Sequence, residues 1–290
     1  MRDIFKLQDE IVRSLITTVG LELSLLERGI VIPQQTNSLE AYDYLLRGFE
    51  GVITPTPEAY ARSRKMFETA IALDPRYADA YAWLGLLRLS AYIWQWDGKH
   101  ALDEAEEFAQ KAVSLDNYNS SAYAVLGWVA MFRHRFDESV ADGEHAVTLN
   151  PNNAFAYLAL SEISGGAGKP EAQVAYAKKA LRLDPRHPEL YFFEIGWAYI
   201  AMERYRESAD AFNAAPPNNP YTHVGLIYAY MELGRDRDAR TEAAQVLRLS
   251  PKFSLKIVKE TFRRTGGSRG DWDDPVRRHL LDDLRKAGLK

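Results

Sequence analysis

The sequence predicts an all-α fold, a right-handed superhelix of stacked antiparallel helix pairs with extra helices at both ends. The first observation is a recurring turn signal of the Asp-Pro type. It occurs at Pro75, Asn117, Pro151, Pro185, Pro220 and Pro251, at intervals of 42, 34, 34, 35 and 31 residues. A period near 34 is typical of helix–turn–helix arrays. The second observation is a hydrophobic fraction of 47% in 290 residues, which is enough for a core that extends by addition of units.

Each unit has the same physical anatomy. In the third unit the recurring positions are Tyr123, Leu126, Gly127 and Ala130, then Ser139, Gly143 and Ala146, then Pro151. Spacings of three and four residues place side chains on one helical face. The small residues let paired helices approach closely, and an aromatic residue fills the gap to the next unit. Proline then ends the second helix, because it disfavours helical geometry in the residue before it.

This pattern resembles the tetratricopeptide repeat (TPR), in which W-x2-L-G-x2-Y, A-x3-F and a terminal P recur. The likeness covers roughly residues 41–251, so we expect about six units within residues 39–252. It departs from the repeat by about three extra residues in the first unit and about eight in the second. The second insertion carries Trp94 and Trp96, which we expect to pack against the first unit, with a partner contact as the alternative.

Segments outside the array are expected to be helical. Residues 1–38 are predicted to hold an amphipathic helix with Asp3 as its cap, followed by a linker. Its apolar face carries Ile4, Leu7, Ile11, Leu15 and Val19. This face must dock on the array, on a second copy in a homo-oligomer, or on an upstream domain. Residues 253–290 are predicted to cap the array, because its last unit has no neighbour to bury it. The final helix should begin at Asp274 and Pro275, bury Val276, Leu280 and Leu284, and stop at Gly288.

A narrower resemblance links the chain to bacterial signalling proteins. The stretches DIFKLQDEI and AYDYLLRG, the WQW of the second unit and the closing DDP…LLDDLRKAGL are similar to the C-terminal TPR region of class III adenylate/guanylate cyclase-like proteins. The resemblance implies an interaction or sensory arm of a larger protein or a stand-alone relative. None of the cyclase catalytic motifs is present, so we predict that the chain is not an enzyme and uses no cofactor.

Composition excludes several other classes of function. The chain has no cysteine, which excludes disulfides and thiolate metal sites and fits a cytoplasmic protein. A formal charge of −4 without a basic cluster argues against nucleic acid as a partner. The longest uncharged apolar run, residues 123–132, is much shorter than the roughly 20 residues of a membrane span.

The stretch GGAGKPEA at 165–172 invites comparison with a phosphate-binding loop. Such a loop requires GxxxxGK followed by Ser or Thr, on a strand-to-helix turn. Here Pro170 follows Lys169, and the stretch lies where the other units place the turn between their helices. Pro170 suits the first turn of a helix, where its missing N–H costs little. We therefore interpret it as a turn that binds no nucleotide.

The six histidines are scattered along the chain without metal-ligand spacing. The best constellation is Glu138, Asp142 and His145, at i, i+4 and i+7 of one helix. An ordinary solvated helix face carries the same residues, so we predict neither a metal site nor a catalytic group.

The predicted site is the concave groove of units three to five. In TPR arrays the second, fifth, ninth, twelfth and thirteenth positions of the first helix commonly face this groove. Those positions include Trp128, Met131, Phe132, Phe155, Leu158, Leu190, Phe193, Trp197, Ile200, Tyr221, Tyr228 and Met231. An exposed apolar groove is usually a binding site, and Glu162 and Glu194 could select a basic residue if they border it. The alternatives are that the register is shifted or that the chain itself covers the groove.

The predicted function is that of a non-catalytic scaffold for protein–protein interaction, in which a partner peptide or helix occupies the groove. One alternative is a sensor arm that binds a small apolar ligand or lipid and regulates a cyclase or a transcriptional output. Another is a structural module that self-associates. Fold class by itself does not distinguish these functions.

Overall fold

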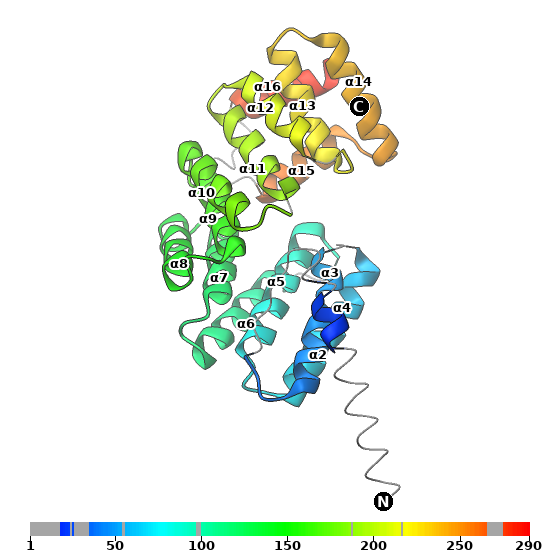
Figure 1. The fold of residues 1–290 in the computed structure, drawn as a ribbon. Coiled ribbons are helices and arrows are strands. Elements are labelled where there is room, and N and C mark those ends of the chain that lie inside the picture. The colour runs from blue at the N-terminus through cyan, green and yellow to red at the C-terminus, as the bar shows by residue number, and fades with distance from the viewer. Residues whose placement is uncertain are drawn as a thin grey trace, which may run out of the picture. The chain divides into compact units, whose positions relative to one another are not determined.

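The computed structural model describes residues 18–23, 25, 35–53, 56–96, 100–186, 188–215, 217–265 and 275–290. All regular secondary structure in these ranges is helical (Figure 1). The all-α prediction is therefore confirmed. The chain divides into two compact units, Met1–Val129 and Ala130–Lys290, which are described separately.

The first unit is built from helices that pack in sequence order. They are α2 (Leu39–Gly48), α3 (Glu50–Ile53), α4 (Pro57–Leu73), α5 (Ala78–Trp94), α6 (Ala101–Leu115) and the start of α7 (Ser120–Phe132). Helix α4 packs between α2 and α5, and α5 packs on α6. Ser38 and Thr56 cap α2 and α4, and each side chain accepts a hydrogen bond from the backbone N–H of the third residue of its helix.

The described part of the N-terminal segment docks on α2. Leu25 joins the buried core of the first unit. Thr18 donates a hydrogen bond to Asp43 at 3.3 Å, and Tyr42 donates one to Glu22 at 2.6 Å. These contacts agree with the expected docking on the array for the described residues of this segment. Val19, which was expected on the docked apolar face, is instead 49% exposed, because the segment contacts α2 through Thr18, Glu22 and Leu25. The predicted cap and the rest of the predicted apolar face lie outside the described residues.

The insertion in the second repeat packs against the first repeat, as predicted, and both repeats belong to the first compact unit. Trp96 lies 5.9 Å from the ring of Tyr60 on α4, measured between ring centroids. Trp94 stacks on Trp96 at 6.1 Å and remains 48% exposed. The insertion therefore extends the aromatic core of the first compact unit through Trp96, and it leaves Trp94 partly in solvent.

The second unit continues the pattern of antiparallel pairs. Its helices are α8 (Phe136–Leu149), α9 (Ala154–Gly166), α10 (Pro170–Leu183), α11 (Pro188–Ala201), α12 (Tyr205–Ala214), α13 (Pro220–Glu232) and α14 (Asp236–Leu249). The glycine-rich stretch is the turn between α9 and α10. Gly168 has a φ of 74°, a left-handed conformation that favours glycine, and Pro170 is in the first turn of α10.

Phe212 is the central side chain of this unit, and it is 1% exposed. Its ring lies against the backbone of Gly196 on α11 and of Gly225 on α13. A Cβ at Gly196 would lie only 2.7 Å from Phe212 Cε1. Glycine at both positions therefore lets α11 and α13 close on the ring from two sides.

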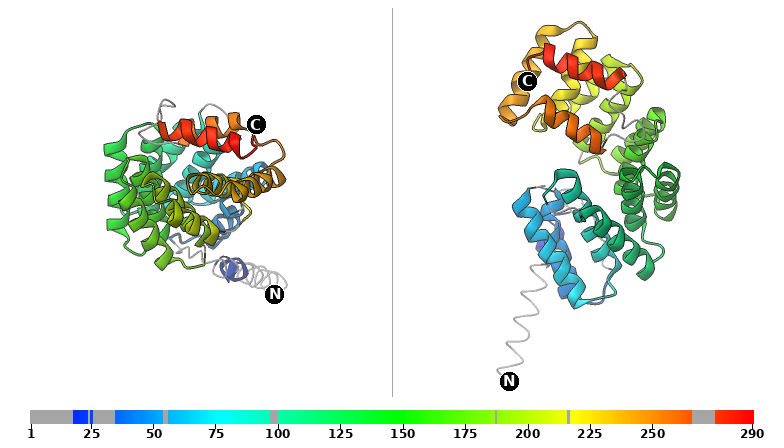
Figure 2. Two further views of the ribbon diagram at one scale, coloured as in Figure 1. Left: turned by 90° about the horizontal axis from the view of Figure 1, so that it is seen from above. Right: turned by 180° about the vertical axis from the view of Figure 1, so that it is seen from behind.

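Two further helices close the C-terminal end. They are α15 (Leu255–Thr265) and α16 (Pro275–Lys286), and α16 lies against α13 (Figure 2). Leu280 and Leu284 are buried, as the capping prediction requires. The side chain of Val276, the third predicted residue, is not among those that the structure describes. The backbone N–H of Leu255 donates a hydrogen bond to the carbonyl of Lys290 at 2.8 Å, which holds the end of the chain on α15. Gly288, with a φ of 112°, follows the end of α16.

Candidate functional site

The predicted groove residues differ widely in exposure. Four of the nine principal residues are buried: Trp128, Met131, Phe132 and Tyr228. The other five are partly exposed: Phe155, Leu158, Phe193, Trp197 and Tyr221. Ile200 is buried, and Leu190 is 48% exposed. Among the predicted residues named here, the second set and Leu190 offer surface to a partner without a rearrangement of the chain.

The C-terminal helices cover two of the predicted residues. The hydroxyl group of Tyr221 is 2.8 Å from Thr261 Oγ1 on α15, and its ring packs edge-on against Phe253 at 5.7 Å. Tyr228 packs edge-on against His279 of α16 at 6.2 Å. The α13 part of the predicted stripe is therefore occupied by the chain itself, which is one of the alternatives that the sequence left open.

Phe193 and Trp197 form an aromatic cluster with Phe212. Phe193 lies 6.2 Å from Trp197, and Trp197 lies 5.5 Å from Phe212, in edge-to-face geometry. Edge-to-face aromatic pairs add about 0.5–1.5 kcal/mol beyond the burial of their area. Trp197 therefore belongs largely to the core, whereas Phe193 also faces a pocket.

A pocket of about 280 Å³ lies among α9, α11 and the loop that leads into α13. It is lined by Leu158, Glu162, Leu190, Phe193, Glu194, Ala215, Asn218, Asn219 and Thr222. Three of these are predicted groove residues, and two are the carboxylates that were expected to border the groove. The pocket thus combines apolar walls with two acidic side chains.

Glu194 is an acid of the pocket with a raised pKa. Gln173 Nε2 donates a hydrogen bond to Glu194 Oε2 at 2.9 Å. Burial raises the pKa of Glu194 to about 7, although the hydrogen bond from Gln173 acts in the opposite direction. Near neutral pH this group therefore exists in both protonation states, and a cation in the pocket would favour the ionised one.

His223 holds the loop that forms one wall of the pocket. Its ring is buried on α13, with Nε2 3.0 Å from the carbonyl oxygen of Pro217 and Nδ1 2.5 Å from Glu242 Oε2. The hydrogen bond with Glu242 raises the pKa of His223 above its ordinary value. The protonated ring can donate to both oxygens at once. Asn219, which lines the pocket, caps α13 by accepting from the N–H of Tyr221.

Sequence reasoning missed the loop residues of this pocket. Asn218, Asn219 and Thr222 precede or begin α13 and lie outside the groove positions of the repeat. The run PPNN at 216–219 signals a turn, but a turn signal does not show that the loop bends toward a neighbouring helix pair.

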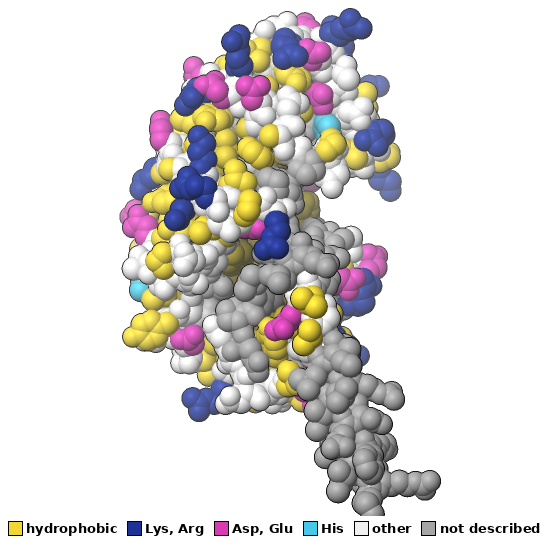
Figure 3. Space-filling model, viewed as in Figure 1, with side chains coloured by type: hydrophobic (Ala, Val, Ile, Leu, Met, Phe, Trp, Pro, Cys, Tyr) yellow, Lys and Arg dark blue, Asp and Glu magenta, His cyan; other side chains and the backbone are white. Residues whose placement is uncertain are grey.

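Two of the remaining sequence candidates, Glu138 and Asp142, lie on α8 in different surroundings. Glu138 pairs with Arg135 at 3.2 Å on the surface of α8, and burial raises the pKa of Asp142 to about 6. Lys/Arg and Asp/Glu side chains are interspersed over the face seen in Figure 3. In the ranges that the structure describes, no helix combines the length and the apolar character needed to cross a bilayer.

Comparison with known proteins supports the fold. The tetratricopeptide repeat family matches residues 156–187, which include most of α9 and α10. The APC/C hetero-tetramer Cut9-Hcn1 contains a chain similar to 86% of this one and 45% of its own length, with a TM-score of 0.61 and 16% identity. PilW, a type IV pilus biogenesis factor, matches 77% of this chain over 99% of its own, with a TM-score of 0.57 and 18% identity. A thermophilic TPR protein of Thermus thermophilus matches 71% of this chain over 99% of its own, with a TM-score of 0.51 and 20% identity.

The chain therefore has an all-α solenoid fold of the tetratricopeptide repeat type, and residues 156–187 match the repeat family itself. It is similar to a protein of Rhizobium meliloti (strain 1021) named "Putative adenylate cyclase 3", with 29% identity over 134 residues. That match covers 43% of this chain and 22% of the relative, so the chain spans about a fifth of the length of that protein. The likeness agrees with the predicted resemblance to cyclase-associated TPR regions.

Proposed function

We propose that this chain is a non-catalytic interaction module that binds a basic side chain of a partner protein in the pocket among α9, α11 and α13. The observation that carries the proposal is the lining of this pocket. Glu162 and Glu194 share it with the apolar walls formed by Leu158, Leu190 and Phe193. Residues 39–252 are the proposed interaction array, and residues 253–290 are its proposed cap.

An arginine or lysine side chain fits this chemistry. Its apolar stem can lie along Leu158 and Phe193 while its charged end reaches the carboxylates. Hydrogen bonds between ionised groups are roughly twice as strong as those between neutral groups. The volume of about 280 Å³ is below the range of roughly 300–1,000 Å³ that holds a complete drug-sized ligand. The pocket therefore suits one anchoring side chain of a longer peptide.

The biological setting that we propose is bacterial cytoplasmic signalling. The support is the likeness to the cyclase-named protein of Rhizobium meliloti, which covers 134 residues of alignment. In this proposal the chain recruits a partner and carries no catalytic group of its own. A small apolar ligand is the alternative occupant, and self-association is the alternative role.

Fluorescence polarisation with labelled alanine-rich peptides tests the proposal. The peptides differ at one central residue, which is Arg, Lys, Gln or Glu. We expect the Arg and Lys peptides to bind more tightly than the Gln peptide, and the Glu peptide to bind most weakly. Glu194→Gln should reduce the advantage of Arg over Gln by about tenfold, because one charge-assisted hydrogen bond is lost. Glu144→Gln, an exposed change on α8, should leave it unchanged.

Equal binding of all four peptides, or the same Arg preference in Glu194→Gln and the parent protein, would contradict the proposal. If a neutral apolar probe such as N-phenyl-1-naphthylamine binds the chain and the four peptides show no difference in affinity, the result would favour the sensor alternative. Sedimentation measured in parallel reports on self-association.

A further inference from the structure

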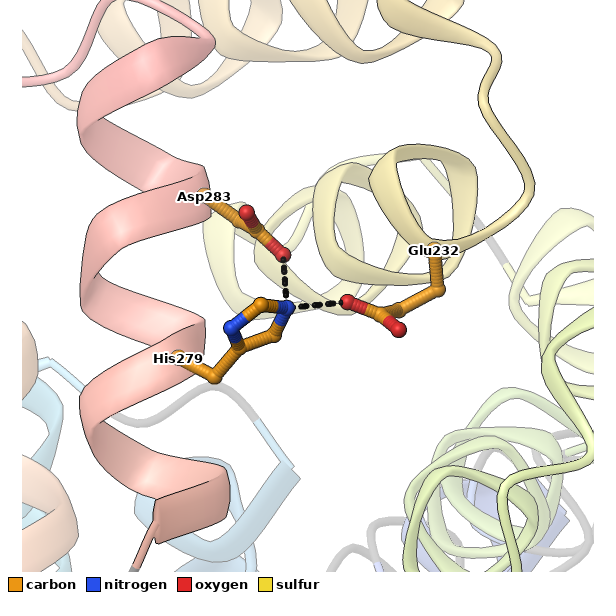
Figure 4. Close-up of side chains that lie close together, drawn as sticks. All are labelled: Glu232, His279 and Asp283. Atoms are coloured by element: carbon orange, nitrogen blue, oxygen red, sulfur yellow. Dashed lines mark hydrogen bonds and ion pairs between the residues drawn. The ribbon is translucent and has the colours of Figure 1, made fainter.

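Three side chains from two helices point toward one another where α16 packs on α13 (Figure 4). Glu232 is the last residue of α13, and His279 and Asp283 lie one turn apart on α16. One oxygen or nitrogen atom from each of the three lies within 4.8 Å of the others. Together they define the α13–α16 cluster, which lies apart from the pocket residues.

His279 is at the centre of this cluster. Its Nε2 atom is 2.6 Å from Glu232 Oε1 and 3.5 Å from Asp283 Oδ2, and it faces both carboxylates (Figure 4). The imidazole side chain is 51% exposed, whereas the side chain of Asp283 is only 2% exposed. The cluster thus combines one half-exposed side chain with one buried side chain.

The second observation is the state of the Asp283 carboxylate. Its Oδ1 accepts a hydrogen bond from Lys286 Nζ at 3.0 Å. Its Oδ2 is buried and has no hydrogen-bond partner among the described residues, although it faces His279 Nε2. A buried carboxylate oxygen without a donor is costly, and such an atom in a native fold calls for an explanation. A cation held between Asp283 and His279 would satisfy it.

We propose that Glu232, His279 and Asp283 bind one divalent transition-metal ion of the Zn²⁺ type. Zn²⁺ commonly takes one or more imidazole nitrogens with carboxylate oxygens, at about 2.0–2.2 Å, and tetrahedral ligands at that length lie about 3.3 Å apart. The 3.5 Å between His279 Nε2 and Asp283 Oδ2 matches this spacing, and the 2.6 Å between His279 Nε2 and Glu232 Oε1 would have to lengthen by less than about 1 Å. Mg²⁺ and Ca²⁺ prefer all-oxygen sites with six or more ligands, which this cluster does not offer.

Side chains around the cluster hold the three ligands in place. Tyr205 hydrogen-bonds Glu232, and Lys286 holds the outer oxygen of Asp283. The ring of Tyr228 packs edge-on against the imidazole of His279. Outer contacts of this kind orient metal ligands and commonly change metal affinity by 10–100-fold when removed. The half-exposed imidazole gives an ion a direct path from solvent.

The metal would join the C-terminal helix to the array. Two of its ligands lie on α16 and one on α13, and these helices come together only in the folded chain. An ion that binds the folded state alone stabilises it by mass action. The proposed site is therefore a metal clasp on the cap, independent of the peptide pocket and of its occupant.

Calorimetric titration of the full, tag-free chain with ZnCl2 tests the proposal at neutral pH. We expect one site per chain, a melting temperature that rises with Zn²⁺ and falls again with EDTA, and a visible absorption spectrum of four-coordinate Co²⁺. His279→Gln and Glu232→Gln should each weaken binding by at least about 10-fold, since even outer contacts have effects of that size. His100→Gln is the matched control. His100 is also an exposed histidine that pairs with an aspartate, Asp103, but this pair lies at the start of α6, outside the α13–α16 cluster.

Circular dichroism of the unliganded variants shows whether they are folded, and the partly exposed position of His279 makes Gln tolerable there. Binding of Zn²⁺ by the folded His279→Gln variant with the affinity of the parent protein would overturn the proposal. So would the absence of measurable heat, together with the absence of a Co²⁺ spectrum, when the parent protein is titrated with an excess of each metal.

Discussion

Asn119 Nδ2 donates a hydrogen bond of 2.6 Å to Asp79 Oδ1, between two buried side chains that lie 40 residues apart in the chain. Asn119 also caps α7 through its Oδ1 atom, which accepts from the N–H of Ala122. One amide side chain therefore joins the start of α5 to the start of α7. The cost of this arrangement is a carboxylate kept away from water.

Asp79 should make the stability of the chain depend on pH. Burial raises the pKa of Asp79 to about 6. Because the folded-state pKa lies above the unfolded value near 4, its contribution is complete below about pH 4 and is lost as pH rises through about 6. In urea unfolding, the free energy of unfolding of Asp79→Asn should rise relative to that of the parent protein by on the order of 1–3 kcal/mol between pH 4 and 7. The exposed Asp210→Asn should show no such gain, and a constant difference for Asp79→Asn would contradict the argument.

Binding of a basic peptide should strengthen as pH rises. The pKa of Glu194 is about 7, and the ionised carboxylate is the form that attracts a cation. Affinity for the Arg peptide should therefore increase about tenfold from pH 6 to pH 8, as Glu194 changes from mostly neutral to mostly charged. The Gln peptide should change little, and Glu194→Gln should remove the pH dependence. If the Arg peptide instead binds more tightly at pH 6 than at pH 8, the neutral form of Glu194 is the one that binds it, and the prediction is wrong.

Leu190 and Leu247 are two exposed leucines that provide a matched pair for testing the pocket. Leu190 is 48% exposed and lines the pocket, whereas Leu247 is 40% exposed on α14. Leu190→Ala should weaken the Arg peptide by about 3- to 10-fold, because the apolar stem loses contact area. Leu247→Ala should not change affinity. Equal peptide affinities in both variants would place the binding surface elsewhere.

A methyl group at Gly225 should disturb the core of the second unit. A Cβ there overlaps the ring of Phe212, which is already fully enclosed. Gly225→Ala should lower the free energy of unfolding by about 1–3 kcal/mol, as overpacking usually does. Gly20→Ala is the control, because nothing lies within 4 Å of its Cβ position. Alanine should stabilise that helical residue by up to about 1 kcal/mol. Chemical denaturation of both variants decides whether the signs differ.

The capping helix should contribute substantially to stability through Leu284. This side chain is 0% exposed on α16, in the core of the second unit. Leu284→Ala should cost about 2–5 kcal/mol, the usual range for a buried leucine. Leu247→Ala, on the exposed face of α14, should cost less than about 1 kcal/mol. If the two variants melt at the same temperature, α16 does not cap the array in solution.

The sequence predicted the repeat and its helices well because these depend on local signals. Pro151 and Pro185 mark turns, and Gly127 and Gly143 mark close helix contacts within one period. The stretch around Lys169 is a turn because Pro170 suits the first turn of a helix, whatever lies elsewhere in the chain. Such rules operate within a few residues, so one sequence suffices to apply them.

The candidate site was predicted only in part. Leu158, Phe193 and Glu194 meet in the pocket, as the groove positions indicated. Tyr221 and Tyr228 have the same repeat positions but are covered by helices from beyond the array. Repeat position states which way a side chain points and does not state what packs on it.

The sequence by itself determined the all-α class, the repeat of about 34 residues and the capping helix that begins at Pro275, because backbone preferences and helical spacing are local properties. Only the tertiary structure decided which surface stays open and which polar groups meet. Glu232 and His279 are 47 residues apart and touch because α16 folds back on α13. That contact depends on burial of the apolar face around Leu280 and Leu284, a cooperative property of the whole second unit that no short stretch of sequence contains.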